Sequence, residues 1–138
     1  MKTKFFAAFL LIVLLLAACG GSEAGSGAGS GQVSEAAKKY AGLVGDPVKG
    51  KAHYESTCIA CHGPEGVGVQ GLGKGLATSE WVKSQSDADL ILFLAEQGRP
   101  AGDPLNSTGI DMPVKGGNPA LKTQDLADIV AYIRTLQK

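Results

Sequence analysis

The sequence has 138 residues, 44% of them hydrophobic and 6% aromatic, and its 13 basic residues balance 13 acidic ones. This length predicts one small domain, and the even charge without a basic run gives no indication of nucleic-acid binding. We find no Ser/His/Asp set, phosphate-binding loop or carboxylate cluster suited to a metal, so the sequence does not indicate an enzyme.

The first 18 residues have the pattern of a signal peptide. A short positive segment, residues 1–4, precedes an apolar run over residues 5–16 that is too short to span a bilayer. The run ends in Leu-Ala-Ala-Cys, where the residues before Cys19 resemble a bacterial lipobox. We predict a lipoprotein signal peptide over residues 1–18 and a lipidated Cys19. The alternative is an ordinary secretory signal that leaves Cys19 as a stray thiol.

A flexible tether is predicted over residues 19–32. Residues 20–31 read GGSEAGSGAGSG, and such a Gly/Ser-rich composition cannot bury a core. Its root-mean-square reach is about 20 Å. Residues 33–138 then form the predicted domain.

The domain is expected to begin with a short Ala-rich helix over residues 34–44 and a second helix over residues 47–60. Asp46 is the predicted N-cap of the second helix and Pro47 its first residue. Gly50 lies inside this helix, where glycine costs about 1 kcal/mol relative to alanine, so a packing reason is expected.

The C-terminal end of the second helix presents Cys58-Ile59-Ala60-Cys61-His62, and Cys-x-x-Cys-His is the attachment signature of c-type haem. Each thiol can form a thioether with one haem vinyl group, and the histidine can bind the iron. A redox dithiol and half of a zinc site are the alternatives. Zinc needs about four ligands. His53 is the only other histidine and Cys19 the only other cysteine, so a second zinc half-site is missing.

Glycine-rich residues 63–75 are expected to wrap closely around a flat cofactor, with Leu72 and Leu76 as buried anchors. One or two helical turns are predicted over residues 79–84. A clearer helix follows from the N-cap Ser86 to Gly98.

Residues 99–117 are rich in Pro, Gly and Asp, and contain Met112-Pro113. The last helix is predicted after Pro119, with Thr123 as its cap and an apolar stripe at helical spacing. No stretch alternates at period two, so the predicted fold class is all-α.

Met112 is the predicted second axial ligand of the iron. It is the only methionine after residue 18, and it lies in an irregular segment rather than on a helical stripe. His53 is in the same predicted helix as Cys58, which places it badly for the opposite haem face. A His62/Met112 pair fills the iron, disfavours oxygen binding and suits electron transfer.

Together these residues resemble a class I monohaem cytochrome c from about Asp46 to the C-terminus, and the N-terminal part resembles bacterial lipoprotein cytochromes. The resemblance rests on the haem motif, Met112-Pro113, Gly50-x-x-x-Tyr54 and Ala131-Tyr132-Ile133-Arg134. It implies N- and C-terminal helices that cross around one covalent haem c, with Gly50 facing Tyr132.

The sequence departs from the family pattern after the haem motif. The family often has Gly-Pro-x-Leu there, and the proline carbonyl accepts the ring N–H of the proximal histidine. We take Val69-Gln70-Gly71-Leu72 as the comparable stretch, which places the acceptor near Gln70 or Gly71. Trp81 and Arg99 are candidates for contacts to the haem propionates or for a purely structural role.

These features predict a single-electron carrier, lipid-anchored through Cys19 on the extracytoplasmic face of a membrane. Its expected partners are the lipid bilayer and respiratory or photosynthetic membrane complexes that give and take electrons. The alternatives are a fixed cytochrome c subunit of an oxidase or quinol-oxidising complex, and a haem enzyme or sensor with an open sixth position.

Overall fold

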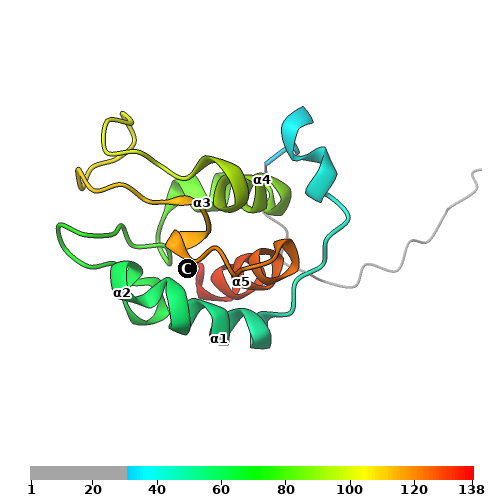
Figure 1. Ribbon diagram of the computed structural model, residues 1–138, viewed down its shortest axis with the longest axis horizontal. Helices are drawn as coiled ribbons and strands as arrows, with labels where there is room; N and C mark the ends of the chain where they lie inside the picture. The colour runs from blue at the N-terminus through cyan, green and yellow to red at the C-terminus, as the bar shows by residue number, and fades with distance from the viewer. Residues whose placement is uncertain (1–30) are drawn as a thin grey trace, which may run out of the picture.

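The computed structural model describes residues 31–138, which fold into short helices joined by long loops (Figure 1). The predicted signal peptide, Cys19 and most of the tether lie outside these residues. The helices and helical turns are η1 (Glu35–Tyr40), α1 (Pro47–Thr57), α2 (Ile59–His62), η2 (Pro64–Gly66), α3 (Glu80–Ser84), α4 (Asp87–Leu92), η3 (Phe93–Gln97), η4 (Val114–Gly117) and α5 (Thr123–Leu136).

Residues 31–138 contain no β-strand, only two isolated β-bridges, so the all-α prediction is confirmed. Within the same residues, none of the helices has both the length and the apolar character needed to cross a membrane.

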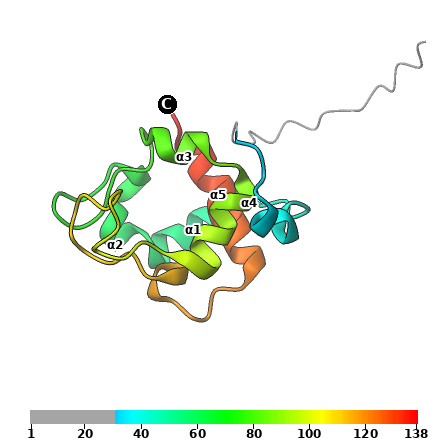
Figure 2. The same cartoon turned by 90° about the horizontal axis from the view of Figure 1, so that it is seen from above.

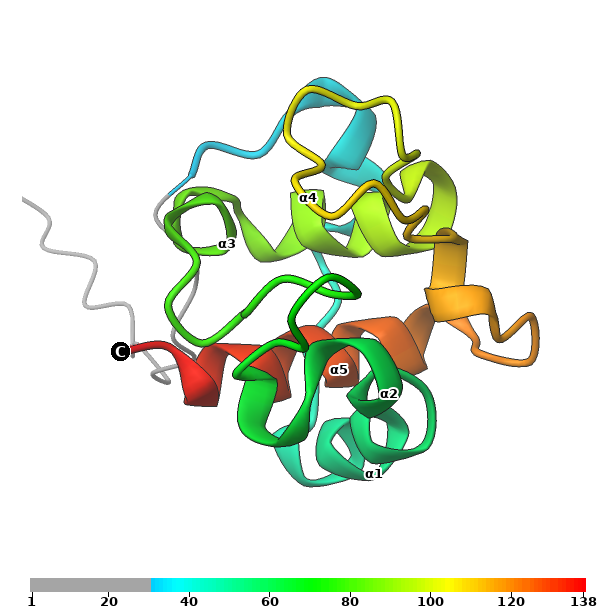
Figure 3. The ribbon, with the colours of Figure 1, turned by 90° about the vertical axis from the view of Figure 1, so that its left-hand side faces the viewer.

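The crossing of α1 and α5 is the main helix–helix contact, and both side views show the two helices against each other (Figures 1 and 3). A Cβ added at Gly50 would lie 1.8 Å from the carbonyl oxygen of Asp128, so only glycine allows this approach. The atoms nearest to such a Cβ are backbone atoms of Asp128 and Ile129, so the packing reason for this glycine is a backbone approach and not the expected ring of Tyr132. The ring of Tyr132 instead packs against Tyr54, with 5.3 Å between the ring centroids.

Helix α1 begins as predicted but ends earlier. The side chain of Asp46 accepts hydrogen bonds from the backbone N–H groups of Val48, at 2.9 Å, and Lys49, at 3.3 Å. The continuous helix predicted to residue 60 is wrong, because α1 ends at Thr57 and α2 starts at Ile59. The break falls on Cys58, which is the C-cap of α1 and the N-cap of α2, and Cys61 lies within α2.

The later helices follow their predicted starts, with one correction. Ser86 caps α4 by accepting from the N–H of Asp89 at 3.1 Å, and the π-helical turn η3 extends this helix to Gly98. The N-cap of α5 is Lys122 rather than the predicted Thr123. Its N–H donates to the carboxylate of Asp125 at 2.8 Å, and this bond fixes the helix start one residue earlier.

The core is built mainly from the apolar faces of α4, η3 and α5, with Tyr54 of α1 packed among them. Its most buried side chains are Tyr54, Ile91, Leu126, Ile129 and Val130. The predicted N-terminal helix is a 3₁₀ turn, η1, which buries Ala37 against Ala88 and Leu92 on the outer side of α4.

Candidate haem pocket

One large apolar pocket is lined by residues of α2, α3, α4 and α5. Figure 2 shows these helices arranged in a ring. Leucine, isoleucine, valine and aromatic residues form the largest group among the residues that line the pocket. All four residues predicted to hold a haem line this pocket: Cys58, Cys61, His62 and Met112. An apolar slot with two thiols, an imidazole and a thioether fits a haem bound through both its edge and its iron.

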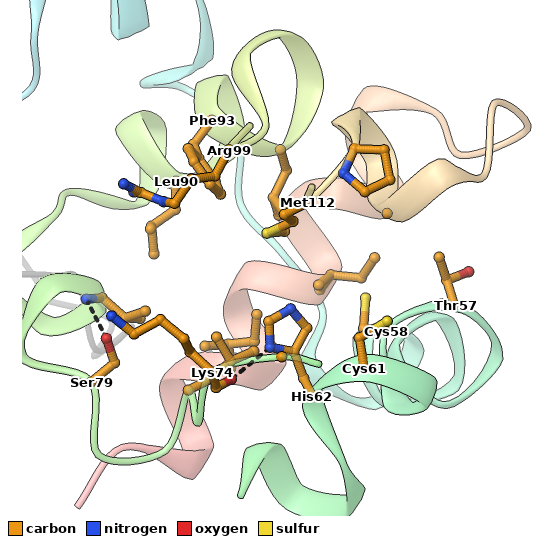
Figure 4. Close-up of a pocket in the computed structure, with 18 of the residues that line it drawn as sticks. Thr57, Cys58, Cys61, His62, Lys74, Ser79, Leu90, Phe93, Arg99 and Met112 are labelled. Atoms are coloured by element: carbon orange, nitrogen blue, oxygen red, sulfur yellow. Dashed lines mark hydrogen bonds between the residues drawn. The ribbon is translucent and has the colours of Figure 1, made fainter. Parts of the chain in front are cut away.

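The two thiols lie on one side of the pocket, beside His62 (Figure 4). The turn is held by the N–H of His62, which donates to the carbonyl of Cys58 at 2.9 Å. Burial raises the pKa of the Cys58 thiol to about 11. A redox dithiol needs a first thiol of low pKa, so this environment disfavours that alternative.

His62 is oriented by a backbone carbonyl. Its Nδ1 lies 2.7 Å from the carbonyl oxygen of Lys74. Because a carbonyl only accepts, Nδ1 carries the proton and Nε2 keeps a free lone pair. In Figure 4 this second nitrogen points across the pocket toward Met112. A histidine prepared in this way is suited to bind a metal through Nε2.

The carbonyl that accepts from His62 was expected near Gln70 or Gly71. It is that of Lys74, further along the chain, so this expectation was wrong. The matching stretch is Gly73-Lys74-Gly75-Leu76, in which Lys74 takes the place of the family's proline. The Gly-x-x-Leu spacing at this position was a signal that the sequence contained. Leu72, expected to be a buried anchor, is 38% exposed, whereas Leu76 packs against the core as predicted.

Met112 enters the pocket from the wall opposite His62, and its sulfur is directed inward (Figure 4). The backbones of Arg99 and Met112 form an isolated antiparallel bridge. In each direction the N–H of one residue donates to the carbonyl of the other at 2.8 Å. Met112 thus stands on a fixed piece of backbone within an irregular segment.

Trp81 and Arg99, the residues considered for propionate contacts, are neighbours in the pocket wall. The guanidinium of Arg99 lies over the ring of Trp81, at 4.7 Å, and over Phe93, at 5.2 Å. It also pairs with the carboxylate of Asp103 at 3.0 Å. These contacts give both residues a structural role, and their propionate contacts stay a prediction.

His53 lies away from the pocket, as its place in α1 predicted. Its Nε2 is 3.5 Å from a carboxylate oxygen of Asp125, and the carboxylate of Asp128 is close to both. Both carboxylates accept hydrogen bonds from backbone N–H groups. Asp125 accepts from the N–H of Lys122, at 2.8 Å, and Asp128 from the N–H of Asp46, at 2.8 Å. This cluster fastens α1 to α5.

A family model described as cytochrome c matches residues 47–137. The chain is 29% identical over 90 residues to the cbb3-type cytochrome c oxidase subunit CcoP of Azospirillum brasilense. It is 28% identical over 88 residues to cytochrome c-555 of Prosthecochloris aestuarii.

Each match covers 64% of this chain, together with 85% of cytochrome c-555 but 30% of the oxidase subunit. The chain thus corresponds to less than a third of that subunit's length. No solved structure matches the chain significantly.

Proposed function

The chain belongs to the cytochrome c family, since the family model covers more than half of its residues, and we propose that it is a single-electron carrier with one covalent haem c. The observation that carries this proposal is the convergence of Cys58, Cys61, His62 and Met112 on one apolar pocket. Similarity to proteins named as a cytochrome and an oxidase cytochrome subunit supports the electron-carrying role.

In this proposal Cys58 and Cys61 attach the cofactor. Each S–H would add across one vinyl group, so that sulfur bonds to one carbon and hydrogen goes to the other. His62 would bind iron through Nε2, while its bond to the carbonyl of Lys74 holds the imidazole in one tautomer and one orientation. Bound haem would supply a one-electron iron couple at a potential that Met/His ligation raises.

Met112 separates a carrier from a haem enzyme or sensor. With its thioether on the iron, the sixth position is filled and small ligands must compete for it. The expected sign is a methionine-to-iron charge-transfer band in the oxidised protein that disappears in Met112→Ala. A wild-type protein without this band, or a Met112→Ala variant that keeps it, would show that the axial assignment is wrong.

We further propose that residues 1–18 are a lipoprotein signal peptide and that Cys19 is lipidated. Residues 19–32 would then tether the domain to the extracytoplasmic face of a membrane. A tether confines the domain near its partners and raises their effective concentration. Intact mass of the purified protein tests the covalent groups together, because it reports one haem and the acyl chains as separate increments.

A fixed subunit of an oxidase is the second candidate, and the match to an oxidase subunit is what favours it. A mobile carrier solubilised in mild detergent would migrate alone on a native gel. A subunit would migrate with a large complex. The mass increments above would be the same in both cases, so only the gel separates them.

A further inference from the structure

Residues 99–112 form a loop whose two ends are pinned together. The Arg99–Met112 bridge closes it, and the N–H of Ala101 donates to the carboxylate of Asp111 at 2.6 Å just inside the bridge. The guanidinium of Arg99 pairs with Asp103, which also accepts from the N–H of Leu105 at 2.7 Å. The loop therefore has its own cross-links, and Met112 is its last residue.

Asn106 lies at the centre of this loop and uses both ends of its side-chain amide. Its Nδ2 donates to the carbonyls of Pro100, at 3.0 Å, and Ile110, at 2.8 Å, which belong to the two opposite limbs. Its Oδ1 accepts from the N–H and the hydroxyl of Thr108, both at 3.0 Å, and from the N–H of Gly109 at 3.1 Å.

This set of partners requires an amide. The carbonyls of Pro100 and Ile110 can only accept, and the N–H groups of Thr108 and Gly109 can only donate. A carboxylate would satisfy the second pair but would place an acceptor against the first. An aliphatic side chain would remove all of these bonds, and only the carbonyl of Pro100 would keep another donor, the N–H of Asp103 at 3.0 Å.

We propose that Asn106 is a positioning residue for Met112: it holds the limbs of the loop together and so keeps the thioether directed into the pocket. The inference rests on the proposed His62/Met112 ligation. Asn106 acts through the carbonyl of Ile110, two residues before Met112, and through that of Pro100, next to Arg99. Without these two bonds the loop opens more often, and Met112 leaves the pocket with it.

Competition with imidazole measures this opening. Imidazole can reach the iron only when Met112 has left it, so its apparent affinity scales with the fraction of open loop. Each lost hydrogen bond changes such an equilibrium severalfold. In the oxidised holoprotein, Asn106→Asp should bind imidazole about tenfold more tightly than the wild type and weaken the methionine charge-transfer band.

Two further variants test whether a change in imidazole affinity comes from the hydrogen bonds of Asn106. Thr108→Val removes only the hydroxyl that donates to Oδ1 of Asn106 and accepts from the N–H of Ile110, so a shift of about threefold is expected. Ser107→Ala changes the exposed neighbour between them and should match the wild type. A purely structural role of Asn106 would lower the unfolding midpoint without changing imidazole affinity.

The outcomes separate this inference from the proposed function. If the wild type shows the band and Asn106→Asp binds imidazole within twofold of it, the positioning role is wrong and the ligation stands. If the wild type lacks the band, the ligation itself is wrong. Should Asn106→Asp yield no holoprotein, Thr108→Val decides, because tighter imidazole binding supports the role and wild-type affinity overturns it.

Discussion

The phenol of Tyr54 donates a 2.7 Å hydrogen bond to the carbonyl oxygen of Gly63, the residue that directly follows His62. Tyr54 is 0% exposed and Gly63 is buried, so the bond lies inside the protein and ties α1 to the end of the haem motif. Burial raises the pKa of Tyr54 to about 12, which keeps the phenol protonated and able to donate throughout the neutral range.

Tyr54→Phe should lower the free energy of unfolding by about 1 kcal/mol, because the buried carbonyl of Gly63 then keeps only the longer bond from the N–H of Gly66, at 3.3 Å. Chemical denaturation of the holoprotein at neutral pH measures this loss. Tyr132→Phe is the matched control. Its hydroxyl makes no hydrogen bond within residues 31–138, although the ring packs against Tyr54, so its effect should be small. Equal losses in the two variants would contradict the role given to the Tyr54 bond.

Gly50→Ala should be among the most damaging single changes. The added Cβ would lie 1.8 Å from the carbonyl oxygen of Asp128, so α1 and α5 would have to move apart. We expect a loss of about 3 kcal/mol or more in the free energy of unfolding, again by denaturation.

Gly42→Ala is the control for that change, since a Cβ at Gly42 meets no atom within 4 Å. It should leave stability unchanged or raise it by a few tenths of a kcal/mol through the unfolded chain. A Gly50→Ala protein as stable as Gly42→Ala would show that the two helices do not cross as closely as described.

Asp89 gives the fold a sensitivity to acid. Burial alone would raise its pKa, but hydrogen bonds from Ser34 and Ser86 outweigh this and hold the pKa below its ordinary value. The bonds from Ser34 join the start of η1 to α4, with Oγ of Ser34 at 2.5 Å from the carboxylate. A lowered folded pKa means that the stabilisation is complete above the unfolded pKa, about 4, and is lost as the pH falls through the folded value.

The comparison that tests this is Asp89→Asn against the wild type at several pH values. At pH 7 the variant should be less stable by several tenths to about 1 kcal/mol, because Asp89 is only half-buried and solvent screens its charge. Below about pH 4 the difference should shrink, since Asp89 of the unfolded wild type then takes up a proton and the folded carboxylate follows at lower pH. A difference that stays constant from pH 7 to pH 3 would argue against the carboxylate as the cause.

Features set by neighbouring residues could be predicted from the sequence. Asp46 and Ser86 cap helices because side-chain oxygens two or three residues from free N–H groups have few alternatives. The haem motif and Met112 could be found because their chemistry is rare in the chain. The side chains of Cys58, Cys61, His62 and Met112 all line one pocket in the structure.

The features that could not be predicted depend on how backbone segments far apart in the sequence approach one another. The acceptor for His62 is a backbone carbonyl, which any residue offers, so the side chain of Lys74 does not mark it and only the Gly73-x-x-Leu76 spacing around it does. The partner of Gly50 is backbone as well. The sequence around Asn106 is that of an ordinary loop. Its side chain joins the carbonyls of Pro100 and Ile110, ten positions apart, and only the structure shows that these two segments lie side by side.

Gly98→Ala tests the other support of Met112, the bridge to Arg99. Gly98 has φ +60°, and a Cβ there would lie 2.4 Å from the carbonyl oxygen of Met112, which accepts from the N–H of Arg99. The substitution should break the bridge and remove most of the methionine charge-transfer band in the oxidised protein. Gly102→Ala, where a Cβ meets nothing within 4 Å, should keep the band. A full band in Gly98→Ala would mean that Met112 holds its place without the bridge.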